Sequence, residues 1–567
     1  MFTKNLTGLL HPKSPAWFWL LIIYTATAGC WQISCTELLP DEAYYWLYAQ
    51  NPDWGYFDHP PMVALFIRVG YAFFKHEAGV RIVFLLVSLL SLYIARKIAK
   101  PTHELLFAAA VLSLPAMQLG NGIAAPDIPL LFFALLFISL AGRFAATPSP
   151  TYATALALVT AAMLYSKYHA VLIILFSILA YPAVLRLRWF WVAAALCALL
   201  YLPHLWWQWQ RGFPSVVYHL SSRHATSWSI GYTLNYILGQ WLMLGPLISL
   251  PMLYFLFRWR PPDISGKLMQ YNVIGFLLFF LLSSFRSNVE ANWTSPILVP
   301  FAILCYKVAE SDSRLTRLIT VSGALMAVIV LIIKFVLTAH ATERYVAARS
   351  DWRGWKSTVL AVQSVAGKMP VAFMNSYQLA SLYQFYTKQV ATSVNTTGQR
   401  SNQFDYWQYG VQMCGRQVLL ITNDWYYRSP HRISTPRCEL SYVNIPAFHT
   451  AYHIELRATP LRSDVLAGDT LPVTLFVQNK FTDTSLTAAC ISGEATISYQ
   501  FIQPGHHLPP VSTTLNLNPR MQRDTLRCLV KAPLVPGRYE LYFTASGALS
   551  QIHIPLSHRL VIRVKQQ

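Results

Sequence analysis

The sequence has few charged residues for its length. Asp, Glu, Lys and Arg make up 12% of the 567 residues, and hydrophobic residues make up 54%. A soluble domain typically contains about 25% charged residues, so this composition excludes a soluble enzyme. Apolar segments recur from Trp17 to about Thr338 and then become scarce. The pattern is typical of a protein that crosses a membrane several times and carries a polar C-terminal region.

Zinc-type cysteine patterns are also missing. No two of the 8 cysteines have Cys-x-x-Cys spacing, and no Cys and His residues are spaced as zinc ligands. Half of the cysteines lie in or beside apolar segments, where Cys behaves as a small hydrophobic residue: Cys30, Cys35, Cys197 and Cys305. The others can form disulfides if the polar region faces an oxidising compartment, and their pairing stays open: Cys414, Cys438, Cys490 and Cys528.

Nucleic-acid binding is not indicated, although the formal net charge is +20. Much of the basic excess lies in short segments between apolar runs, where Lys and Arg set the orientation of membrane spans. Basic residues are not interleaved with aromatic residues in the way that is typical of RNA- or DNA-binding surfaces. We therefore expect no nucleic-acid partner.

The apolar segments predict about eleven membrane spans of about 20 residues each. No cleavage site followed by a soluble domain is evident after the first span, so we expect it to be retained rather than removed as a signal peptide. The expected spans are residues 16–34, 80–97, 104–120, 127–145, 151–166, 168–185, 189–207, 231–257, 269–285, 294–309 and 315–338.

Basic residues predict which side each loop faces. If the N-terminus is cytoplasmic, every loop on its side contains Lys or Arg, as the positive-inside rule requires. An odd number of spans then places the region from His340 onward outside the cytoplasm. The outer loops hold nearly all the His, Asp and Glu of the membrane region: 36–80, 121–127, 166–169, 208–229 and 285–293. Nucleotide sugars and ATP are cytoplasmic, so a sugar-transfer reaction on that face would need a lipid-carried donor.

The polar region predicts two further parts. Residues 341–445 mix helix-like and strand-like stretches. The rest alternates apolar and polar residues in short runs separated by Gly, Pro and Asn, which is typical of an all-β sandwich. The expected organisation is a membrane domain, 1–340, an extracytoplasmic α/β segment, 341–445, and a β-sandwich-like domain, 446–567.

Acidic and aromatic residues are densest directly after the first span, in the stretch TELLPDEAYYWLYAQNPDWGYFDHPPM. A single acid at the end of a span is ordinary, but Asp41 and Glu42 are adjacent, and Tyr44 and Tyr45 follow them. This group places a carboxylate at the membrane interface, walled by aromatic rings. Such a carboxylate could deprotonate a hydroxyl nucleophile.

Three further candidates each have an ordinary explanation as well. Asp127 begins a later span at the same expected level as Asp41, although the helix macrodipole alone favours an acid there. Lys167 follows a span, where Lys normally extends toward the interface, but it could also bind a phosphate. His59 precedes two prolines, which fix the backbone and would hold the imidazole in place, although a lone His is more often incidental.

Two outer loops add possible ligand contacts. Glu290, Asn292 and Trp293 form either a polar interfacial turn with a belt tryptophan or a cluster that binds a sugar. The loop 208–229 contains basic and imidazole groups that together suit a lipid phosphate: Arg211, His219, Arg223 and His224.

Several of these motifs resemble a known family. The stretches PDEAYYWLYAQNPDWGYFDHPPM, APDIPLLFF, YSKYHAVL and NVEANWTSP resemble the bacterial branch of the dolichyl-phosphate-mannose protein mannosyltransferase-like family. Its members are polyprenyl-phosphate-sugar glycosyltransferases with the GT-C fold, and they include the lipid A aminoarabinose transferase and the lipopolysaccharide-core galacturonosyltransferases. The resemblance covers about residues 15–340, and the β-rich end has no clear counterpart.

The resemblance implies a polytopic α-helical GT-C membrane protein in the bacterial inner membrane, with its active site and C-terminal domain on the periplasmic side. It would move one sugar, with inversion, from undecaprenyl phosphate to lipid A, lipopolysaccharide or a related envelope glycan. Polyprenyl phosphate is a good leaving group, so we expect no cofactor; a divalent metal could assist, but no motif indicates a metal ligand.

The resemblance also implies roles for individual residues. Asp41, Glu42 and Asp127 match the catalytic acids, with Asp41 as the base. His59 stands where the aminoarabinose transferase pattern has Lys, and a neutral His binds phosphate less strongly. The expected donor-phosphate ligands are His59, Lys167, Arg211 and Arg223; the expected sugar or acceptor ligands are Tyr44, Tyr45, Asp58, His169, Glu290, Asn292 and Trp293.

Two other functions remain open from the sequence. The acceptor could be Ser or Thr of a protein, with the same type of donor. A transporter or flippase for a lipid-linked sugar is an alternative of another class. It predicts ionisable residues in the middle of spans and inverted repeats, whereas the acids here lie at span ends on one face.

Overall fold

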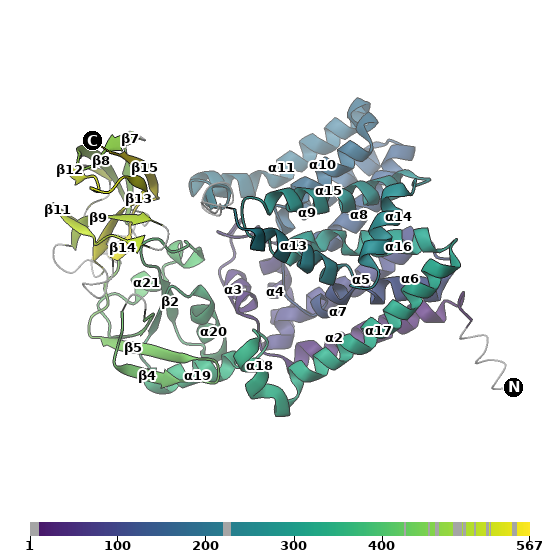
Figure 1. Cartoon of the computed structure of the whole chain (residues 1–567), viewed down its shortest axis with the longest axis horizontal. Coiled ribbons are helices and arrows are strands. Elements are labelled where there is room, and N and C mark those ends of the chain that lie inside the picture. Colours follow the sequence, from purple (N-terminus) through teal and green to yellow (C-terminus); the bar gives the residue numbers. More distant parts are fainter. Residues whose placement is uncertain are drawn as a thin grey trace. The chain divides into compact units, whose positions relative to one another are not determined.

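The structure is a computed structural model with two compact units, Met1–Val346 and Ala347–Gln567 (Figure 1). It describes residues 11–218, 228–424, 427–451, 454–459, 464–479, 490, 495–503, 506–517, 521, 523–546 and 553–566. The first unit is helical, and the second contains all the described strands.

Within the described part of the first unit, 6 helices are long and apolar enough to cross a membrane. The chain is therefore a multi-pass membrane protein. These helices are α2 (Ala16–Cys35), α5 (Glu77–Ala99), α8 (Asp127–Ala146), α11 (Arg188–Gln210), α15 (Ile264–Ser283) and α17 (Ser313–Thr338). The expected number of about eleven spans is not confirmed, because the other apolar segments form shorter helices.

Shorter helices complete this unit, and the last of them, α18, extends past its end at Val346. They are α3 (Pro40–Gln50), α4 (Met62–Phe73), α6 (Glu104–Leu112), α7 (Pro115–Gly120), α9 (Pro150–Ser166), α10 (Ala170–Ala180), η1 (Pro182–Arg186), α12 (Pro214–Val217), α13 (Ile230–Met243), α14 (Ser249–Arg258), η3 (Ala291–Ile297), α16 (Leu298–Ala309), η4 (His340–Thr342) and α18 (Glu343–Arg349). Two of them, α3 and α4, lie within the segment 36–80, which is called the first outer segment below after the side that the sequence predicts for it.

Two segments that were expected to be single spans are each broken into two helices. The segment 104–120 breaks before Pro115, because a proline disfavours helical backbone in the residue that precedes it. The segment 231–257 breaks at Gly245, whose φ is +91°. A Cβ atom at Gly245 would lie 2.3 Å from the carbonyl oxygen of Ser113, so the two breaks lie against each other and glycine is required there.

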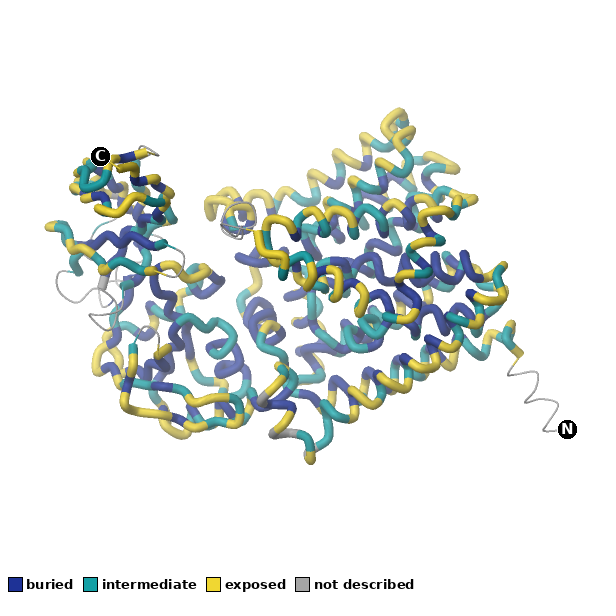
Figure 2. The backbone as a smooth tube through the Cα atoms, in the orientation of Figure 1, coloured by how far each residue is buried: buried dark blue, intermediate teal, exposed yellow. Residues whose placement is uncertain are grey.

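Burial separates the inner helices from the outer ones (Figure 2). Helix α16 is buried along nearly its whole length, whereas α11 is mostly exposed and presents large apolar side chains such as Trp191, Leu199 and Trp206. Exposed apolar surface of this kind suits contact with lipid. Helix α17 packs closely on α6 at Gly323. A Cβ atom at this position would lie only 2.5 Å from the carbonyl oxygen of Ala109, so the close approach requires a glycine.

The second unit begins with a mixed sheet in the order β2-β1-β3-β5-β4. Its strands are β1 (Val371–Met374), β2 (Ala391–Val394), β3 (Val418–Thr422), β4 (His431–Ser434) and β5 (Glu439–Ile445). Strands β2 and β3 pair with β1 in parallel, and the other pairs are antiparallel. The chain also forms α19 (Trp355–Ala366), α20 (Tyr377–Thr387), η5 (Gln403–Asp405) and α21 (Tyr409–Gln412) here.

Two further sheets share one apolar core in the C-terminal part of the second unit. The larger has the order β10-β9-β13-β15-β7, with β11 and β14 paired at its side, and the smaller has the order β12-β8-β6. Val473 and Leu475 of one sheet and Leu541 and Phe543 of the other belong to the same buried cluster. The strands are β6 (Ile454–Ala458), β7 (Asp464–Leu466), β8 (Thr470–Asn479), β9 (Ala495–Gln503), β10 (His506–His507), β11 (Val511–Leu517), β12 (Arg523–Lys531), β13 (Gly537–Ser546), β14 (His553–Pro555) and β15 (Leu560–Lys565). The boundaries at 340 and 445 stay predictions.

Cysteine pairing, which the sequence left open, is defined in the second unit. Cys414 and Cys490 form a disulfide across a sequence separation of 76 residues. Cys438 and Cys528 are free thiols. A disulfide typically stabilises a fold by about 2–4 kcal/mol, and the effect increases with the length of the loop that it closes.

We expect this disulfide to be detectable by thiol labelling of the full chain. After denaturation without reductant, a maleimide reagent should label every cysteine except Cys414 and Cys490. A Cys414→Ser variant should expose Cys490 to the reagent, whereas Cys438→Ser, which removes a free thiol, should leave Cys490 protected. Labelling of Cys490 in the unreduced parent protein, read by peptide mass spectrometry, would contradict this pairing.

Candidate active site

Helix α3 turns one acid outward and the next one inward. The helix begins at Pro40, and the Glu42 carboxylate accepts a hydrogen bond of 2.8 Å from the backbone N–H of Leu39, which caps the helix. Consecutive residues on an α-helix point about 100° apart. Asp41 is accordingly exposed, whereas Glu42 is 1% exposed.

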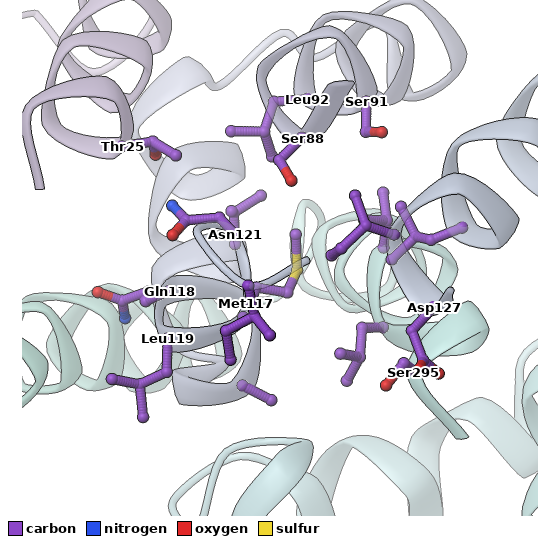
Figure 3. Close-up of a pocket in the computed structure, with 18 of the residues that line it drawn as sticks. Thr25, Ser88, Ser91, Leu92, Met117, Gln118, Leu119, Asn121, Asp127 and Ser295 are labelled. Atoms are coloured by element: carbon purple, nitrogen blue, oxygen red, sulfur yellow. The ribbon is translucent and has the colours of Figure 1, made fainter. Parts of the chain in front are cut away.

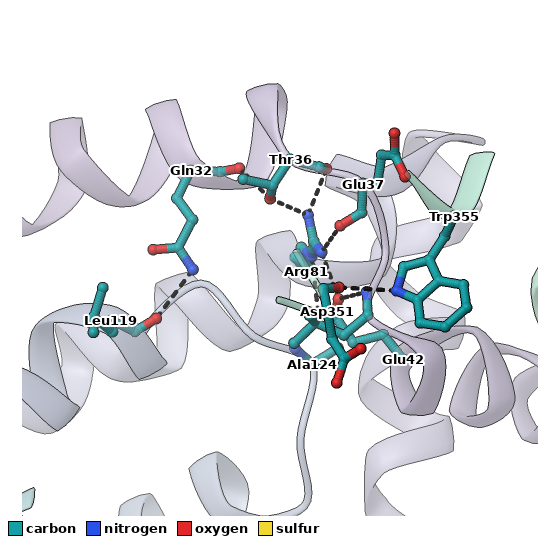
Figure 4. A network of polar contacts seen from close by, with 10 residues as sticks. Gln32, Thr36, Glu37, Glu42, Arg81, Leu119, Ala124, Asp351 and Trp355 are labelled. Carbon is teal, nitrogen blue, oxygen red and sulfur yellow. Dashed lines mark hydrogen bonds and ion pairs between the residues drawn. The ribbon is translucent and has the colours of Figure 1, made fainter. Parts of the chain in front are cut away.

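Glu42 forms a buried ion pair with Arg81 of α5 (Figure 4). The Nε and Nη2 atoms of Arg81 lie 2.8 and 2.5 Å from the two carboxylate oxygens. The guanidinium also donates to Thr36 and to the carbonyl oxygen of Glu37. Bidentate pairing of this kind fixes both position and orientation, so Arg81 ties the start of α3 to α5 and to the end of α2.

The same carboxylate reaches the segment between α7 and α8. Glu42 Oε1 accepts a hydrogen bond of 2.8 Å from the backbone N–H of Ala124. This segment leads directly to Asp127 at the start of α8. Glu42 therefore connects both acidic motifs that the sequence identified, and its side chain is buried.

Tyrosines of α3 hold the second half of the first outer segment. The hydroxyls of Tyr44 and Tyr48 donate to Asp58 Oδ2 at 3.0 and 3.3 Å, and all three side chains are buried. His59 Nε2 lies 3.1 Å from the Tyr45 hydroxyl. The structure thus brings together four predicted site residues, Tyr44, Tyr45, Asp58 and His59, by contacts within this segment.

Side chains of α11 also hold this segment by hydrogen bonds. Trp207 Nε1 donates to Asp53 Oδ2 at 2.8 Å. His204 Nδ1 donates to the carbonyl oxygen of Trp54 at 2.8 Å, and its Nε2 accepts from Tyr168 at 3.2 Å. Burial raises the pKa of Tyr168, so its hydroxyl stays protonated and serves as a donor. Gly55 is needed here, because a Cβ would lie 2.6 Å from the Trp207 ring.

Asp127 and Lys167 form a second buried ion pair. Lys167 Nζ lies 2.7 Å from Asp127 Oδ1, and both side chains are buried. Asp127 begins α8, and Lys167 directly follows α9. The connection between these helices is only three residues long, which makes them antiparallel neighbours and brings the two residues to the same end.

A cavity of about 360 Å3 lies beside these groups (Figure 3). Asn121, Ile123, Ala125 and Asp127 line one side, and the intervening Ala124 is the residue whose N–H reaches Glu42. Other polar residues that line the cavity are Tyr24, Thr25, Ser88, Ser91, Gln118, Asn292, Ser295 and Lys334. The volume lies within the range of about 300–1,000 Å3 that is typical of small-molecule sites.

The remaining predicted ligands are less closely grouped. The His169 ring packs against Phe280 and Trp293, with centroid distances of 5.3 and 5.6 Å. Asn292 lines the cavity, whereas Glu290 and Arg211 are exposed. Arg223, His219 and His224 lie outside the described residues.

The described residues contain no cluster of potential metal ligands. In that part of the chain, no group of three or more His, Cys, Asp or Glu side chains could hold a metal ion. The expectation that no cofactor is required stays a prediction.

Sequence reasoning missed several residues that build the site. Arg81, Asp53, His204 and Trp207 carry its main contacts. Arg81 had a detectable signal, because it is a basic residue at the start of an apolar helix on the side where the positive-inside rule expects few. His204, in the middle of an apolar segment, was also an unusual residue for a membrane span.

Comparisons with known proteins agree with the motifs and the fold. Residues 58–207 match the family model described as dolichyl-phosphate-mannose-protein mannosyltransferase. The chain is 27% identical over 285 residues to the lipid A galacturonosyltransferase RgtD of Rhizobium johnstonii. This match covers 47% of the chain and 60% of RgtD, less than two thirds of that protein.

Two solved structures share the fold. The crystal structure of ArnT from Cupriavidus metallidurans bound to undecaprenyl phosphate has a TM-score of 0.54 and 12% identity, over 76% of this chain and 98% of ArnT. The apo structure of ArnT gives a TM-score of 0.54 with 14% identity, over 75% and 97% of the two chains. Motifs, family model and fold together confirm the resemblance of this chain to the GT-C family of polyprenyl-phosphate sugar transferases.

Proposed function

We propose that the chain is a membrane glycosyltransferase that moves one sugar from a polyprenyl phosphate to lipid A or a related envelope glycan. The observation that carries this proposal is the arrangement around Glu42. The exposed Asp41 carboxylate directly precedes a residue whose side chain is hydrogen-bonded to the wall of a ligand-sized cavity. The name of RgtD supports the acceptor, and the undecaprenyl phosphate in the ArnT crystal structure supports the donor.

In the proposed reaction, Asp41 is the general base. The acceptor hydroxyl attacks the anomeric carbon of the sugar and transfers its proton to the Asp41 carboxylate. The bond between the anomeric carbon and the phosphate oxygen breaks, and the polyprenyl phosphate leaves with the electron pair. Attack from the opposite side inverts the anomeric configuration.

Other predicted site residues take supporting roles in this proposal. Glu42 and Arg81 position Asp41 and the segment 121–127, and Asp127 with Lys167 fixes the end of α8 beside the cavity. His59, held by Tyr45, is a hydrogen-bonding group for the phosphate. Trp293 offers an aromatic face and Asn292 an amide for the sugar. The His169 ring packs against Trp293, and Glu290 is an exposed carboxylate two residues before Asn292.

We further propose that the site faces the periplasm. The distribution of Lys and Arg among the loops supports this orientation. We propose the same side for the second unit, because disulfides such as Cys414–Cys490 persist in oxidising compartments such as the periplasm.

The test is mass spectrometry of lipid A, core oligosaccharide and outer-membrane proteins from the source bacterium, a deletion strain and complemented strains. The deletion should remove one sugar mass from lipid A or the core. Asp41→Asn should fail to restore it, because loss of a general base typically slows transfer by about 10²–10⁴-fold. Asp524→Asn, which removes an exposed carboxylate of β12, should restore it fully.

Other outcomes separate the alternatives. A sugar missing only from proteins would favour a Ser/Thr glycosyltransferase. Full restoration by Asp41→Asn would exclude Asp41 as the base and favour a transporter. Equal expression of the variants, measured by immunoblot, is required for either conclusion.

A further inference from the structure

A lysine that the proposed reaction does not use lines the cavity. Lys334 belongs to α17, four residues before the end of that helix at Thr338, which is about 6 Å along the axis. A lysine so near a helix end normally extends its ammonium to the interface. Lys334 instead is 2% exposed and lines the cavity.

The Lys334 ammonium has no carboxylate partner among the described residues. Its Nζ donates to the carbonyl oxygen of Ala28 on α2 at 3.3 Å. Asp127 lines the same cavity, but its Oδ1 is paired with Lys167. A buried cation inside a membrane protein is costly unless an anion balances it, so the cavity offers a positive charge for a bound anion.

A polar atom without a partner lies in the same cavity. Asn121 is 4% exposed, and its Oδ1 accepts no hydrogen bond from the described residues. Gln118, by contrast, accepts from Tyr24 and donates to the carbonyl oxygen of Leu112. Buried polar groups nearly always have partners, so Asn121 is available to accept a hydrogen bond from a ligand hydroxyl (Figure 3).

We propose that Lys334 and Asn121 form a subsite that selects a substrate with an anionic group next to a hydroxyl. The anionic group is either the carboxylate of an acidic sugar or the phosphate of a lipid, and Lys334 forms a charge-assisted hydrogen bond with it. The inference deepens the proposed function and rests on it. It assigns substrate selection to residues of α2, α7 and α17. The proposed base, Asp41, belongs to a different helix, α3.

The experiment measures binding without turnover, by thermal unfolding of the purified full chain in detergent. Four probes are compared in matched pairs: an octyl hexuronoside with the neutral octyl hexoside, and a short polyprenyl monophosphate with the corresponding polyprenol. A ligand that binds only the folded state raises the Tm in proportion to its affinity. The variants are Lys334→Met, Asn121→Leu, and Lys97→Met, which removes an exposed lysine of α5.

One of the two charged probes should raise the Tm of the parent protein and of Lys97→Met. The neutral partner of that probe should not raise it. Lys334→Met should bind that probe about 10- to 100-fold more weakly, as expected for loss of a hydrogen bond to a charged group. Its unliganded Tm should not fall, because methionine removes an unbalanced charge while keeping similar length. Asn121→Leu should also weaken binding of that charged probe, because a hydroxyl of the probe would lose its hydrogen-bond acceptor.

The identity of the stabilising probe separates the two sources of the anion. Stabilisation by the hexuronoside assigns the subsite to an acidic sugar, and stabilisation by the monophosphate assigns it to a lipid phosphate. Equal binding of the charged probe by Lys334→Met, or no stabilisation of any variant by either charged probe, would overturn the proposal. If the subsite proposal is overturned in this way but Asp41→Asn still abolishes transfer in cells, the proposed function remains intact.

Discussion

Replacing Arg81 by methionine should lower the stability of the first unit by about 3–5 kcal/mol, the typical cost of removing one partner of a buried ion pair. The Glu42 carboxylate would remain buried without its balancing charge, and Thr36 and the Glu37 carbonyl would lose their donor. The measurement is thermal unfolding of the purified chain, together with its yield in the membrane.

Arg68→Met is the matched control for this prediction. Arg68 is exposed, lies in the same segment 36–80, and donates a hydrogen bond to the carbonyl oxygen of Ala49. Its replacement should change stability by no more than about 1 kcal/mol. The double variant Arg81→Met/Glu42→Leu should recover part of the loss, because no buried charge is left unbalanced. If Arg81→Met unfolds at the same temperature as Arg68→Met, the ion pair does not hold this unit together.

The second large effect is expected at Asp127 and Lys167. Asp127→Asn and Lys167→Met each leave one buried charge without its partner, and each should destabilise the chain. The double variant should be less destabilised than the sum of the two single variants, with a coupling energy of about 0.5–3 kcal/mol. Unfolding of all three variants completes this cycle.

Sugar transfer distinguishes a structural pair from one that serves the site. If the pair fixes the cavity wall for the substrate, the double variant should recover stability without recovering transfer, measured as sugar added to lipid A in the deletion strain. Recovery of both would show that the pair is needed only for folding. Strict additivity of the two single effects would show that the charges do not interact as the structure describes.

Sequence patterns were sufficient for the class of fold, whereas the location of the site stays a prediction. Hydropathy identified the six long helices, because each carries an apolar stretch long enough to cross a bilayer. It failed at the segments 104–120 and 231–257, where Pro115 and Gly245 interrupt the helix although the surrounding residues stay apolar. Hydropathy measures composition over a window and is insensitive to one residue that breaks the helix.

Motifs do not reveal which side chains contact one another. Asp127 and Lys167 were predicted as separate ligands, and only the antiparallel arrangement of α8 and α9 shows that they pair. Glu42 was predicted to act in catalysis beside Asp41, but the sequence does not reveal which face of α3 is buried. That information depends on Arg81, which lies 39 residues away.

The contacts of Glu42 also have a consequence for the order in which the protein assembles. A membrane protein is made from its N-terminus, so nearby segments meet before distant ones. Arg81 lies 39 residues after Glu42, and Ala124 lies 82 residues after it. During synthesis the ion pair can therefore form before the helices that follow α5 have been synthesised. The segment that contains Ala124 and forms part of the cavity wall then packs against a Glu42–Arg81 pair that has already formed. The first outer segment therefore folds before the cavity is complete.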